Sequence, residues 1–590
     1  MSDKSKQSSP SPLLISVAKA QKEREEARRN FFWPQERSRS VSYSSLEPSS
    51  DIFPNNHNSI EQSNPYNQTK KFDDLHRHRN NHQDTVEMDS EKNRPSMKQQ
   101  PSRTLYLAAA SGLLGAIGMG LVLGWTAPAF DSMAQPDSEP LLKDSDADKD
   151  AKTWIGSSMT LGALAGAIFS GSISQYFGRK KALILYGIPF TIGWIMLSVA
   201  KSISLLITGR VICGISAGLL SGTAPSYVVE ISVIDIRGLL GACFQLCVTI
   251  GILLVYLMGA YLSWKPLAAI SMIPTILMSI FMFFMPESPS WLLSKGHTDE
   301  ASKSLRRLRG QASDCDQELS VLRSESDTSK KGQGFQLSSY GLRSHWMPLI
   351  LALLLMLFQQ FSGINAIMFY ATKIFAEAGS SIEPKYATII IGVSQVIATL
   401  CGSFLVDRLG RKLLLIVSGL LHVLATGALG LYYYLSEEHQ SNPSNDFGWV
   451  PLVSLVMFII GFSIGYGPIP WLMVAELTPM DSRSTTSAIA TTFNWTCAFI
   501  ITKNFEFLKD SLTKHGTFFL FAAISFISII FVIFMLPETK GKSAEQIQKF
   551  FQSKRSSSYN VSSSGPDNNM LNRSSSIGGS NNEKVALNKL

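Results

Sequence analysis

The sequence predicts an all-α membrane protein with twelve transmembrane helices in two six-helix bundles. Of the 590 residues, 45% are hydrophobic and only 17% are charged, and the mean hydropathy is +0.11. This composition is typical of a chain that crosses a membrane several times. Twelve apolar runs follow Thr104, and each approaches the ~20 residues that a helix needs to cross a bilayer.

The apolar runs also predict the domain organisation. They lie near residues 104–126, 153–175, 182–200, 204–229, 238–262, 266–285, 346–375, 386–406, 413–435, 448–474, 484–505 and 515–536. We expect a first bundle over 104–285, a cytoplasmic linker with short helices over 286–345, and a second bundle over 346–536. The polar segment 1–103 is expected to be a disordered cytoplasmic tail, and 537–590 a cytoplasmic C-terminal tail.

Charge placement predicts the orientation in the membrane. Basic residues fall on alternate loops, on the side that both termini share: Arg179, Lys180, Lys181, Arg237, Arg306, Arg307, Arg309, Arg411, Lys412, Arg483 and Lys540. The opposite loops carry the acidic stretch 144–150 and Glu437-Glu438. The positive-inside rule therefore predicts cytoplasmic termini. We expect a multi-pass protein of the cell membrane, with an endolysosomal membrane as the alternative.

Short motifs recur at an interval of six spans. The repeated pairs are Gly178-Arg179-Lys180 with Gly410-Arg411-Lys412, Glu230 and Arg237 with Glu476 and Arg483, and Pro286-Glu287-Ser288 with Pro537-Glu538-Thr539. Such a repeat indicates two parallel halves of six helices. Two halves with a site between them are typical of transporters that rock around a central site.

The repeated motifs carry charges of both signs at predicted helix ends. We expect the carboxylates Glu230, Glu476 and Asp407 to lie near Arg179, Arg210, Arg237, Arg411 and Arg483. Carboxylate and guanidinium groups can pair bidentately across helices. We interpret Glu230, Arg237, Arg179, Asp407, Arg411, Glu476 and Arg483 as a cytoplasmic gate that closes in one state and parts in another. The alternative is that these residues only anchor helix ends at the lipid headgroups.

A cluster of carboxamides interrupts the seventh apolar run. Within 358–370, Gln359, Gln360 and Asn365 accompany Ser362 and Gly363. An unpaired polar group in hydrocarbon costs several kcal/mol, so these side chains should face a protein interior or a watery cavity. Carboxamides both donate and accept hydrogen bonds, which suits a neutral ligand rich in hydroxyl groups. The alternative is that they only link neighbouring helices.

Taken together, the motifs resemble those of the sugar porter family of the major facilitator superfamily. The residues that carry the resemblance are Pro225–Glu230 with Arg237-Gly238, Pro286–Pro289, Gln359–Asn365, Gly467–Trp471 with Glu476, Asn494-Trp495 and Pro537–Gly541. Among its members, the chain is most similar to the insect facilitated trehalose transporters and related facilitative glucose transporters. The resemblance implies the major facilitator fold.

It also implies a set of sugar contacts, namely Gln245, Gln359, Gln360, Asn365, Trp471, Asn494 and Trp495. The residue types agree with this, because an indole offers a flat apolar face and one N–H donor to a sugar. Three positions depart from the family pattern. The first acidic-basic motif reads Gln175–Arg179, the eighth span has Gln395 and the tenth has Ser463.

The predicted function is facilitative transport of a neutral sugar, with trehalose as the expected substrate. No acid stands in the segment Leu123–Pro128 of the first span, where proton-coupled members of the family carry one. The alternatives are a hexose uniporter, a proton-coupled sugar symporter and a sugar sensor that does not transport. No metal-ligand cluster, nucleophile motif or phosphate-binding loop is present in the sequence. We therefore expect no enzymatic activity, metal site, cofactor or nucleic-acid partner, and a carrier that functions as a monomer in the lipid bilayer.

Overall fold

The computed structural model describes residues 101–142, 146–310, 315–332, 343–377, 382–438, 447–479, 482–542 and 544–552. Helices joined by short connections make up these described parts of the chain. Most of the two predicted tails lies outside them, so the predicted disorder of residues 1–100 is not tested.

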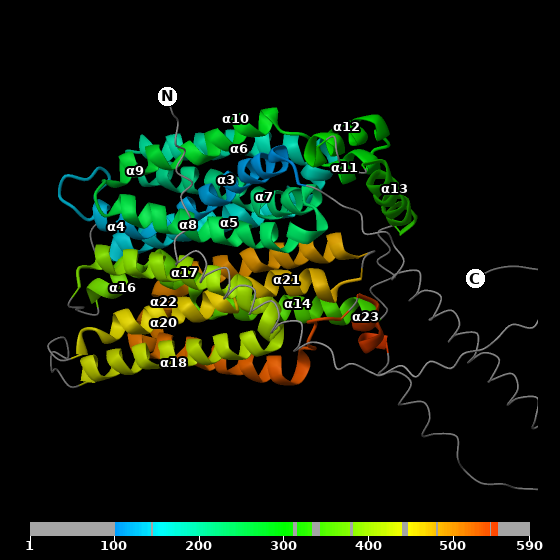
Figure 1. Cartoon of the computed structure of the whole chain (residues 1–590). Helices are drawn as coiled ribbons and strands as arrows, with labels where there is room; N and C mark the ends of the chain where they lie inside the picture. Colours follow the sequence, from blue (N-terminus) through cyan, green and yellow to red (C-terminus); the bar gives the residue numbers. More distant parts are fainter. Residues whose placement is uncertain are drawn as a thin grey trace, which may run out of the picture. The chain divides into compact units, whose positions relative to one another are not determined.

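The first half of the chain forms the spans predicted over 104–285. Its helices are α3 (Arg103–Gly124), α4 (Thr126–Met133), α5 (Asp146–Phe177), α6 (Arg179–Ser198), α7 (Ile203–Ile231), α8 (Ile234–Gly259), α9 (Trp264–Ser271) and α10 (Ile273–Phe284). The first and sixth spans are each divided into two helices, α3 with α4 and α9 with α10. Figure 1 shows these helices, coloured blue to green, gathered in one half of the helical body.

Three short helices follow in the predicted linker. They are α11 (Pro289–Ser294), α12 (Thr298–Arg309) and α13 (Cys315–Gly332). Arg309 at the end of α12 forms an ion pair with Glu318 of α13, 2.8 Å between Nη2 and Oε1, and both side chains are buried. The same guanidinium donates to the carbonyl oxygen of Ile231 at 2.8 Å. These contacts fix the linker to the end of α7.

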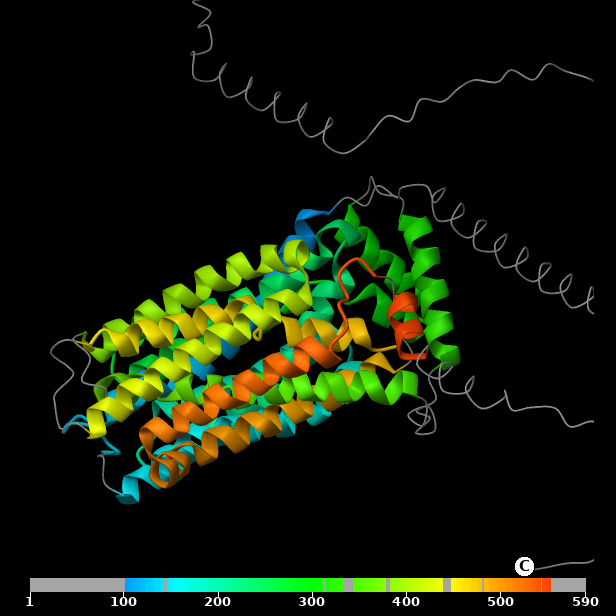
Figure 2. The same ribbon diagram turned by 90° about the horizontal axis from the view of Figure 1, so that it is seen from below.

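The second half repeats the arrangement. Its helices are α14 (Arg343–Phe361), α15 (Ile364–Phe369), α16 (Ala371–Glu377), α17 (Pro384–Leu409), α18 (Arg411–Glu438), α20 (Val450–Ile464), α21 (Ile469–Leu477), α22 (Arg483–Met535) and the short α23 (Ala544–Gln552). Two views at right angles show the long helices running beside one another, with α13 and α23 at the same end (Figures 1 and 2). We call this end, where the repeated charged motifs lie, the motif end, and the opposite one the far end.

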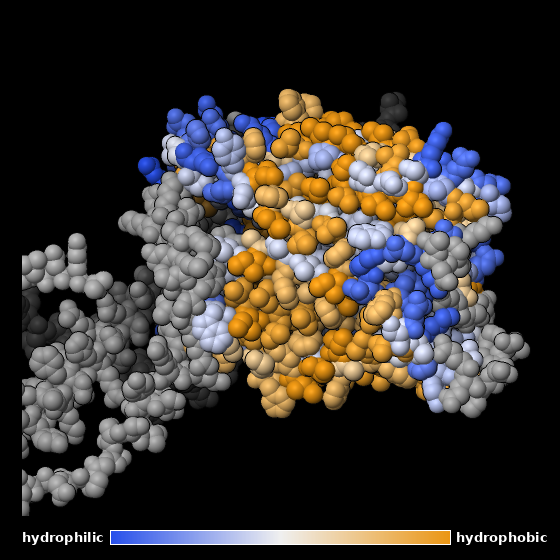
Figure 3. Space-filling model, turned by 180° about the vertical axis from the view of Figure 1, so that it is seen from behind, coloured by the Kyte–Doolittle hydropathy of each residue, from blue (hydrophilic) through white to orange (hydrophobic). Residues whose placement is uncertain are grey.

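Ten helical stretches in the described parts are long and apolar enough to cross a membrane. One of them, Thr485–Met535, covers 51 residues and contains a non-helical residue, Thr513 with φ 65° and ψ 170°, so it holds the two spans predicted there. The 32-residue α5, which includes the predicted span 153–175, is not among the ten. Figure 3 shows an apolar surface over the middle of the helices, with hydrophilic residues toward both ends.

Helix α5 is less apolar than the other spans because it contains glycine and other small residues. The same small residues let it pack closely against α7. A Cβ added at Gly162 or Gly166 would lie 2.2 or 2.1 Å from a carbonyl oxygen of α7. Gly214 and Gly218 of α7 are in equally close contact with the backbone of α5. Small residues let helix backbones approach in this way in membranes, where the hydrophobic effect does not hold helices together. The described structure is thus the two-bundle, all-α membrane fold that the sequence predicts.

Candidate functional site

The seventh span is broken where its amide cluster lies. Helix α14 ends at Phe361, and Gly363 has φ +93° in the left-handed region before α15 begins. This conformation costs an ordinary L-residue ~1–2 kcal/mol but is open to glycine. A Cβ at Gly363 would also lie 2.7 Å from the ring of Phe521. The break therefore lies at a buried position, packed closely against Phe521 of α22.

Four carboxamides form a continuous hydrogen-bonded chain at this break. Asn365 Nδ2 donates to Gln360 Oε1 at 2.6 Å, and Gln360 Nε2 donates to Asn494 Oδ1 of α22 at 3.0 Å. Asn494 Nδ2 then donates to Gln359 Oε1 at 2.6 Å. Gln359, Gln360 and Asn494 are almost fully buried, while Asn365 is half-buried. Three of the predicted contact residues from the seventh span and one from the eleventh therefore belong to one cluster, which we call the amide chain.

The amide chain ends on a second helix break, between α20 and α21. Gln359 Nε2 donates to the carbonyl oxygens of Tyr466 at 2.7 Å and Gly467 at 3.0 Å. These carbonyls are available because the segment 465–468 is not regular helix. Ser418 of α18 supports it, since its Oγ donates to the Gly461 carbonyl and accepts from the Tyr466 N–H. Discontinuous helices whose backbone groups face the interior mark binding sites in secondary transporters.

The two predicted tryptophans lie beside the amide chain. Trp471 of α21 is half-buried and packs in a small cluster with Met356 and Val474. The sulfur of Met356 lies 3.2 Å from Asn494 Nδ2, which connects this cluster to the amides. Trp495 is 5% exposed, and its indole N–H has no hydrogen-bond partner within the described residues. Gln245 lies half-buried on α8 in the first half and is not part of the chain.

The two positions that depart from the family pattern in the eighth and tenth spans are both buried. Gln395 on α17 and Ser463 on α20 are each 3% exposed. The side-chain oxygens Gln395 Oε1 and Ser463 Oγ have no partner in the parts of the chain that the structure describes. A buried polar atom of this kind needs an explanation such as a water or a ligand.

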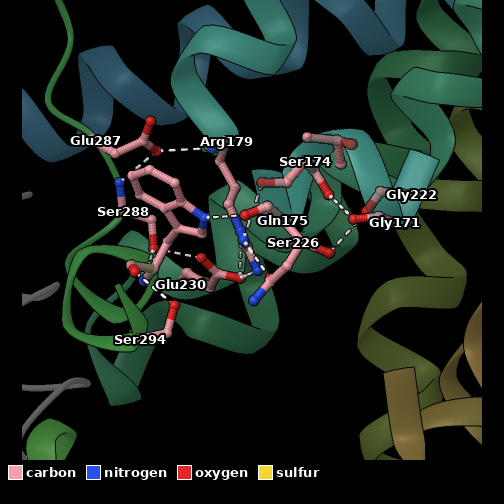
Figure 4. Close-up of polar contacts among 12 residues, drawn as sticks. Gly171, Ser174, Gln175, Arg179, Gly222, Ser226, Glu230, Glu287, Ser288 and Ser294 are labelled. Atoms are coloured by element: carbon pink, nitrogen blue, oxygen red, sulfur yellow. Dashed lines mark hydrogen bonds and ion pairs between the residues drawn. The ribbon is translucent and has the colours of Figure 1, made fainter. Parts of the chain in front are cut away.

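At the motif end of the first half, the repeated residues form one network (Figure 4). Arg179 Nε donates to Glu230 Oε1 at 3.0 Å, and its Nη2 lies 2.9 Å from the same oxygen. Ser288 donates its hydroxyl hydrogen to the other oxygen of Glu230. Glu287 accepts the backbone N–H groups of Arg179 at 2.9 Å and Lys180 at 3.0 Å. This network joins α6, α7 and the segment before α11.

The second half repeats the network with its own residues. Arg411 Nη2 lies 2.9 Å from Glu476 Oε1, and Thr539 Oγ1 donates to Glu476 Oε2 at 2.6 Å. Glu538 accepts the backbone N–H groups of Arg411 at 3.1 Å and Lys412 at 3.0 Å. In the described structure, each ion pair therefore lies within its own half: Arg179 with Glu230 in the first half, and Arg411 with Glu476 in the second.

The two capping glutamates differ in their electrostatics. Burial raises the pKa of Glu287 above its ordinary value of 4.5, despite its backbone donors. Burial also raises the pKa of Glu538, but four backbone N–H groups outweigh this effect and hold that pKa below 4.5. The carboxylate form is thus favoured at Glu538 and disfavoured at Glu287.

The remaining predicted gate residues make fewer polar contacts in the described structure. Arg237 is exposed, and Asp407 is 81% exposed at 3.5 Å from Arg411 on the next helix. Arg483 is half-buried, and its Nε has no partner among the described residues. The prediction that Arg210 lies with the motif carboxylates is wrong. Arg210 is fully buried and donates to Val122 O, Ile155 O and Thr126 Oγ1 at 2.7–3.1 Å, because it faces the ends of other helices in its own half.

Contacts between the two halves gather toward the far end. Thr372 Oγ1 donates to the Ala127 carbonyl at 2.9 Å, and Tyr256 OH donates to the Met368 carbonyl at 3.2 Å. Lys503 of α22 pairs with Asp150 of α5 at 3.1 Å, and its ammonium lies 4.1 Å from the ring centroid of Trp154. These contacts hold the first and second halves together at the far end.

Comparison with known proteins identifies the family. A family model described as "Sugar (and other) transporter" matches residues 109–551. The chain belongs to this sugar transporter family. It is therefore a multi-pass membrane transporter and not an enzyme, and the fold described above is the one that this family uses.

Several curated relatives of this sugar transporter share a name, facilitated trehalose transporter Tret1. The chain is 41% identical to the protein from Bombyx mori over 449 residues, which cover 75% of this chain and 86% of that protein. It is 37% identical to the protein from Apis mellifera ligustica, covering 77% of this chain and 90% of that one. Identity to the Drosophila yakuba protein is 38%, covering 76% of this chain and 52% of that protein.

Solved structures support the fold of this transporter. The proton:xylose symporter XylE bound to 6-bromo-6-deoxy-D-glucose has a TM-score of 0.64 and 24% identity, covering 76% of this chain and 100% of that one. XylE from E. coli in a partially occluded inward-open conformation has a TM-score of 0.63 and 22% identity, covering 75% of this chain and 100% of that one. At these identities, the likeness concerns the fold alone.

Sequence reasoning missed several participants in these networks. In the sequence, Ser288 and Thr539 stand out only as parts of a repeat. In the structure, the Ser288 hydroxyl donates to Glu230 and the Thr539 hydroxyl donates to Glu476. Their repetition beside Glu287 and Glu538 was the available signal. The carbonyl oxygens of Tyr466 and Gly467 could not be found in this way, because any residue supplies a carbonyl and only the break exposes it.

Proposed function

We propose that this transporter carries trehalose across its membrane by facilitated diffusion, as a uniporter that alternates between two open states. The observation that supports this most is the amide chain, in which Asn365, Gln360, Asn494 and Gln359 present neutral donors and acceptors at two helix breaks. Neutral amides suit a neutral polyol better than an ion. The names of the curated relatives favour trehalose among the neutral sugars.

The sugar would bind between the two halves. Gln359, Gln360, Asn365 and Asn494 would exchange hydrogen bonds with its hydroxyl groups, while Trp471 and Trp495 would offer apolar ring faces and indole N–H groups. Gln245 would contact the sugar from the first half. The buried Trp495 N–H supports this assignment, because it has no partner in the described structure.

The charge networks would act as a gate at the cytoplasmic side. Both ion pairs lie within their own halves, while contacts between halves gather at the far end. This pattern supports a state that is open at the motif end and closed at the far end. In the opposite state, Glu230, Arg237, Arg179, Asp407, Arg411, Glu476 and Arg483 would pair between halves and close the motif end.

The placement of the carrier follows from the same charges. Cytoplasmic termini agree with basic residues at the motif end, under the positive-inside rule. We place the carrier in the cell membrane as a monomer, with an endolysosomal membrane as the alternative. Its halves would be residues 104–285 and 346–536, joined by the linker 286–345.

A proton-coupled symporter is the second candidate, because two titratable side chains are buried in the spans. His422 of α18 is 1% exposed and stacks on Phe458, while Glu506 of α22 lies 2.9 Å from Lys373. Buried ionisable groups in membranes can relay protons. Neither group belongs to the amide chain, which is why uniport comes first.

The deciding experiment is uptake of labelled trehalose into liposomes that hold the purified full-length protein, with glucose in parallel and with and without a pH gradient. Saturable trehalose entry that is independent of the pH gradient is the expected result. Entry of glucose alone would change the substrate to a hexose, and entry only with acid outside would establish a symporter. Binding without flux would show a sensor.

A further inference from the structure

We propose that the motif end of the first half binds an anionic phospholipid, with its acidic headgroup held by Lys180, Lys181 and Arg307. This inference concerns the lipid-facing surface and does not depend on which sugar is carried. Three features of the structure favour a phospholipid here. They are the charge complementarity to its headgroup, the apolar surface beneath the cations, and a difference between the two halves.

The three cations lie close together where α6 begins and α10 ends. Arg307 of α12 donates from Nη2 to the Phe284 carbonyl at 2.8 Å, and the ammonium of Lys180 lies 5.9 Å from the ring centroid of Phe283. The charges of Arg307 and Lys181 both act on Lys180. Lys181 and Arg307 are exposed. The cluster therefore concentrates positive charge at the outer surface of the bundle.

The neighbouring acid does not neutralise this cluster. Glu287, whose charge also acts on Lys180, already accepts the backbone N–H groups of Arg179, Lys180 and Ser288. Its carboxylate thus occupies the N-terminus of α6. Three side-chain cations facing one carboxylate leave an excess positive charge that a phosphate-bearing headgroup would balance.

An apolar surface begins directly beside the cations. Phe283 and Phe284 at the end of α10 are 68% and 60% exposed. Further exposed apolar side chains continue along the same two helices, Leu185, Ile188, Ile192 and Ile195 on α6 and Ile273, Ile280 and Phe281 on α10. Cations at the boundary of such a surface match a lipid, whose acyl chains cover the apolar part while its headgroup meets the charges. A soluble anion would not use the apolar part.

Among the residues that the structure describes, the second half is arranged differently. Lys412, which corresponds to Lys180 in the repeated motif, donates its ammonium hydrogen to the Ile533 carbonyl at 2.7 Å. In the first half, it is Arg307 from the linker helix α12 that donates to a carbonyl near the end of the equivalent helix, that of Phe284 in α10. Because Arg307 of the linker binds the end of α10, Lys180 does not make the kind of bond that Lys412 makes in the described second half. Its ammonium lies over the ring of Phe283 instead. The site is therefore specific to one half.

The test measures lipid binding to the purified full-length protein by native mass spectrometry, with phosphatidylserine, phosphatidylcholine and inorganic phosphate as separate probes. The variants are K180Q/K181Q and K180Q/K181Q/R307Q. Lys201, an exposed lysine just beyond the other end of α6, provides the matched control K201Q. Melting temperatures check that each variant is folded.

We expect phosphatidylserine to bind more tightly than phosphatidylcholine. The double variant should weaken phosphatidylserine binding roughly 30-fold and the triple variant roughly 160-fold, at about 1 kcal/mol for each basic residue. K201Q should bind like the wild type. The double variant keeps Arg307 and its bond to α10, so it decides the matter if the triple variant is unstable. Unchanged affinity in the double variant, equal binding of the two lipids, or equally tight binding of inorganic phosphate would overturn the proposal.

Discussion

Glu287 and Glu538 occupy equivalent places in the two halves, and each binds the first two backbone N–H groups of the helix that begins with the basic residues of the motif. Glu287 does so at α6 and Glu538 at α18. A carboxylate at a helix N-terminus is stabilised by the helix dipole and by these donors. The shared geometry nevertheless gives opposite pKa shifts, because the two carboxylates differ in burial and in number of donors.

These shifts predict opposite effects on stability. The pKa of Glu538 is lowered on folding, so the carboxylate stabilises the protein above pH 4.5, and this contribution is lost as the pH falls through the folded-state value. E538Q should therefore melt at a lower temperature than the wild type at neutral pH, with a difference that shrinks in acid. The measurement is the melting temperature in detergent across the acidic to neutral range.

E287Q should behave differently. The pKa of Glu287 is raised on folding, so its protonated form is favoured and its contribution is lost as the pH rises through the folded-state value. E287Q should then melt no lower than the wild type at neutral pH. Glu300, exposed on α12, gives the control E300Q. If both capping variants lost the same stability at every pH, the difference in electrostatics would be wrong.

Gln360 is the central link of the amide chain, so Gln360→Leu should raise the half-saturation concentration for sugar uptake. The change removes one donor and one acceptor and leaves Asn365 and Asn494 without that partner, and each lost bond costs ~1–3 kcal/mol. The measurement is uptake in proteoliposomes, normalised to the amount of protein. Asn504→Leu is the matched control, because Asn504 is exposed on α22 and, among the described residues, its side chain donates to the Ile500 carbonyl of its own helix. Unchanged uptake in Gln360→Leu would contradict the placing of the site.

Gly363→Ala should destabilise the protein and disturb the break in the seventh span. The left-handed conformation costs alanine ~1–2 kcal/mol, and the new Cβ would push on the ring of Phe521. The melting temperature should fall. Gly427→Ala in α18 is the control, since a Cβ there meets nothing within 4 Å and alanine favours helix. A Gly363→Ala protein as stable as the control would show that the break does not depend on glycine.

Removing the contact between Lys503 and Asp150 should open the far end. An exposed ion pair contributes ~0.2–1 kcal/mol, so Asp150→Asn should change the ratio of the two states by no more than about fivefold. Lys503→Gln should act more strongly, because Lys503 also lies over Trp154. Distances between spin labels on α5 and α22 would report the change. Glu383→Gln removes a far-end ion pair within one half and should have no such effect; an equal effect would refute the assignment.

Much of the architecture could be predicted because the bilayer imposes it. Apolar runs near the thickness of the bilayer predicted the ten stretches that are long and apolar enough to cross it, while α5, also expected as a span, is not among these. The repeat of Glu230 and Glu476 with their neighbouring motifs predicted two similar halves. The amides of the seventh span and Asn494 come together as expected for a polar cluster that cannot remain unpaired in the membrane. In these cases one physical constraint, the cost of placing polar groups in the apolar bilayer, acts on residue types that can be read from the sequence.

Other features depend on distances between side chains in the folded protein, which the spacing of residues along the sequence does not determine. Arg210 looked like a member of the motif network by its charge, but its position along α7 brings it to the carbonyl oxygens of Val122 and Ile155. Likewise, in the proposed gate the state would depend on whether an arginine pairs within its half or between halves. Both pairings use the same residues, so composition and repeats cannot distinguish them.

The amide chain has a consequence for the turnover of a uniporter. Such a carrier must return empty after each delivery, or it would only swap one sugar for another. In the described structure, Gln359, Gln360, Asn365 and Asn494 are linked to one another by hydrogen bonds, and Gln359 also donates to the Tyr466 and Gly467 carbonyls. Under this proposal, the amides could restore these hydrogen bonds to one another when a sugar leaves, which would lower the cost of returning without cargo. Under the proposed uniport mechanism, amides that can bond to one another in place of the sugar would favour net flux over exchange.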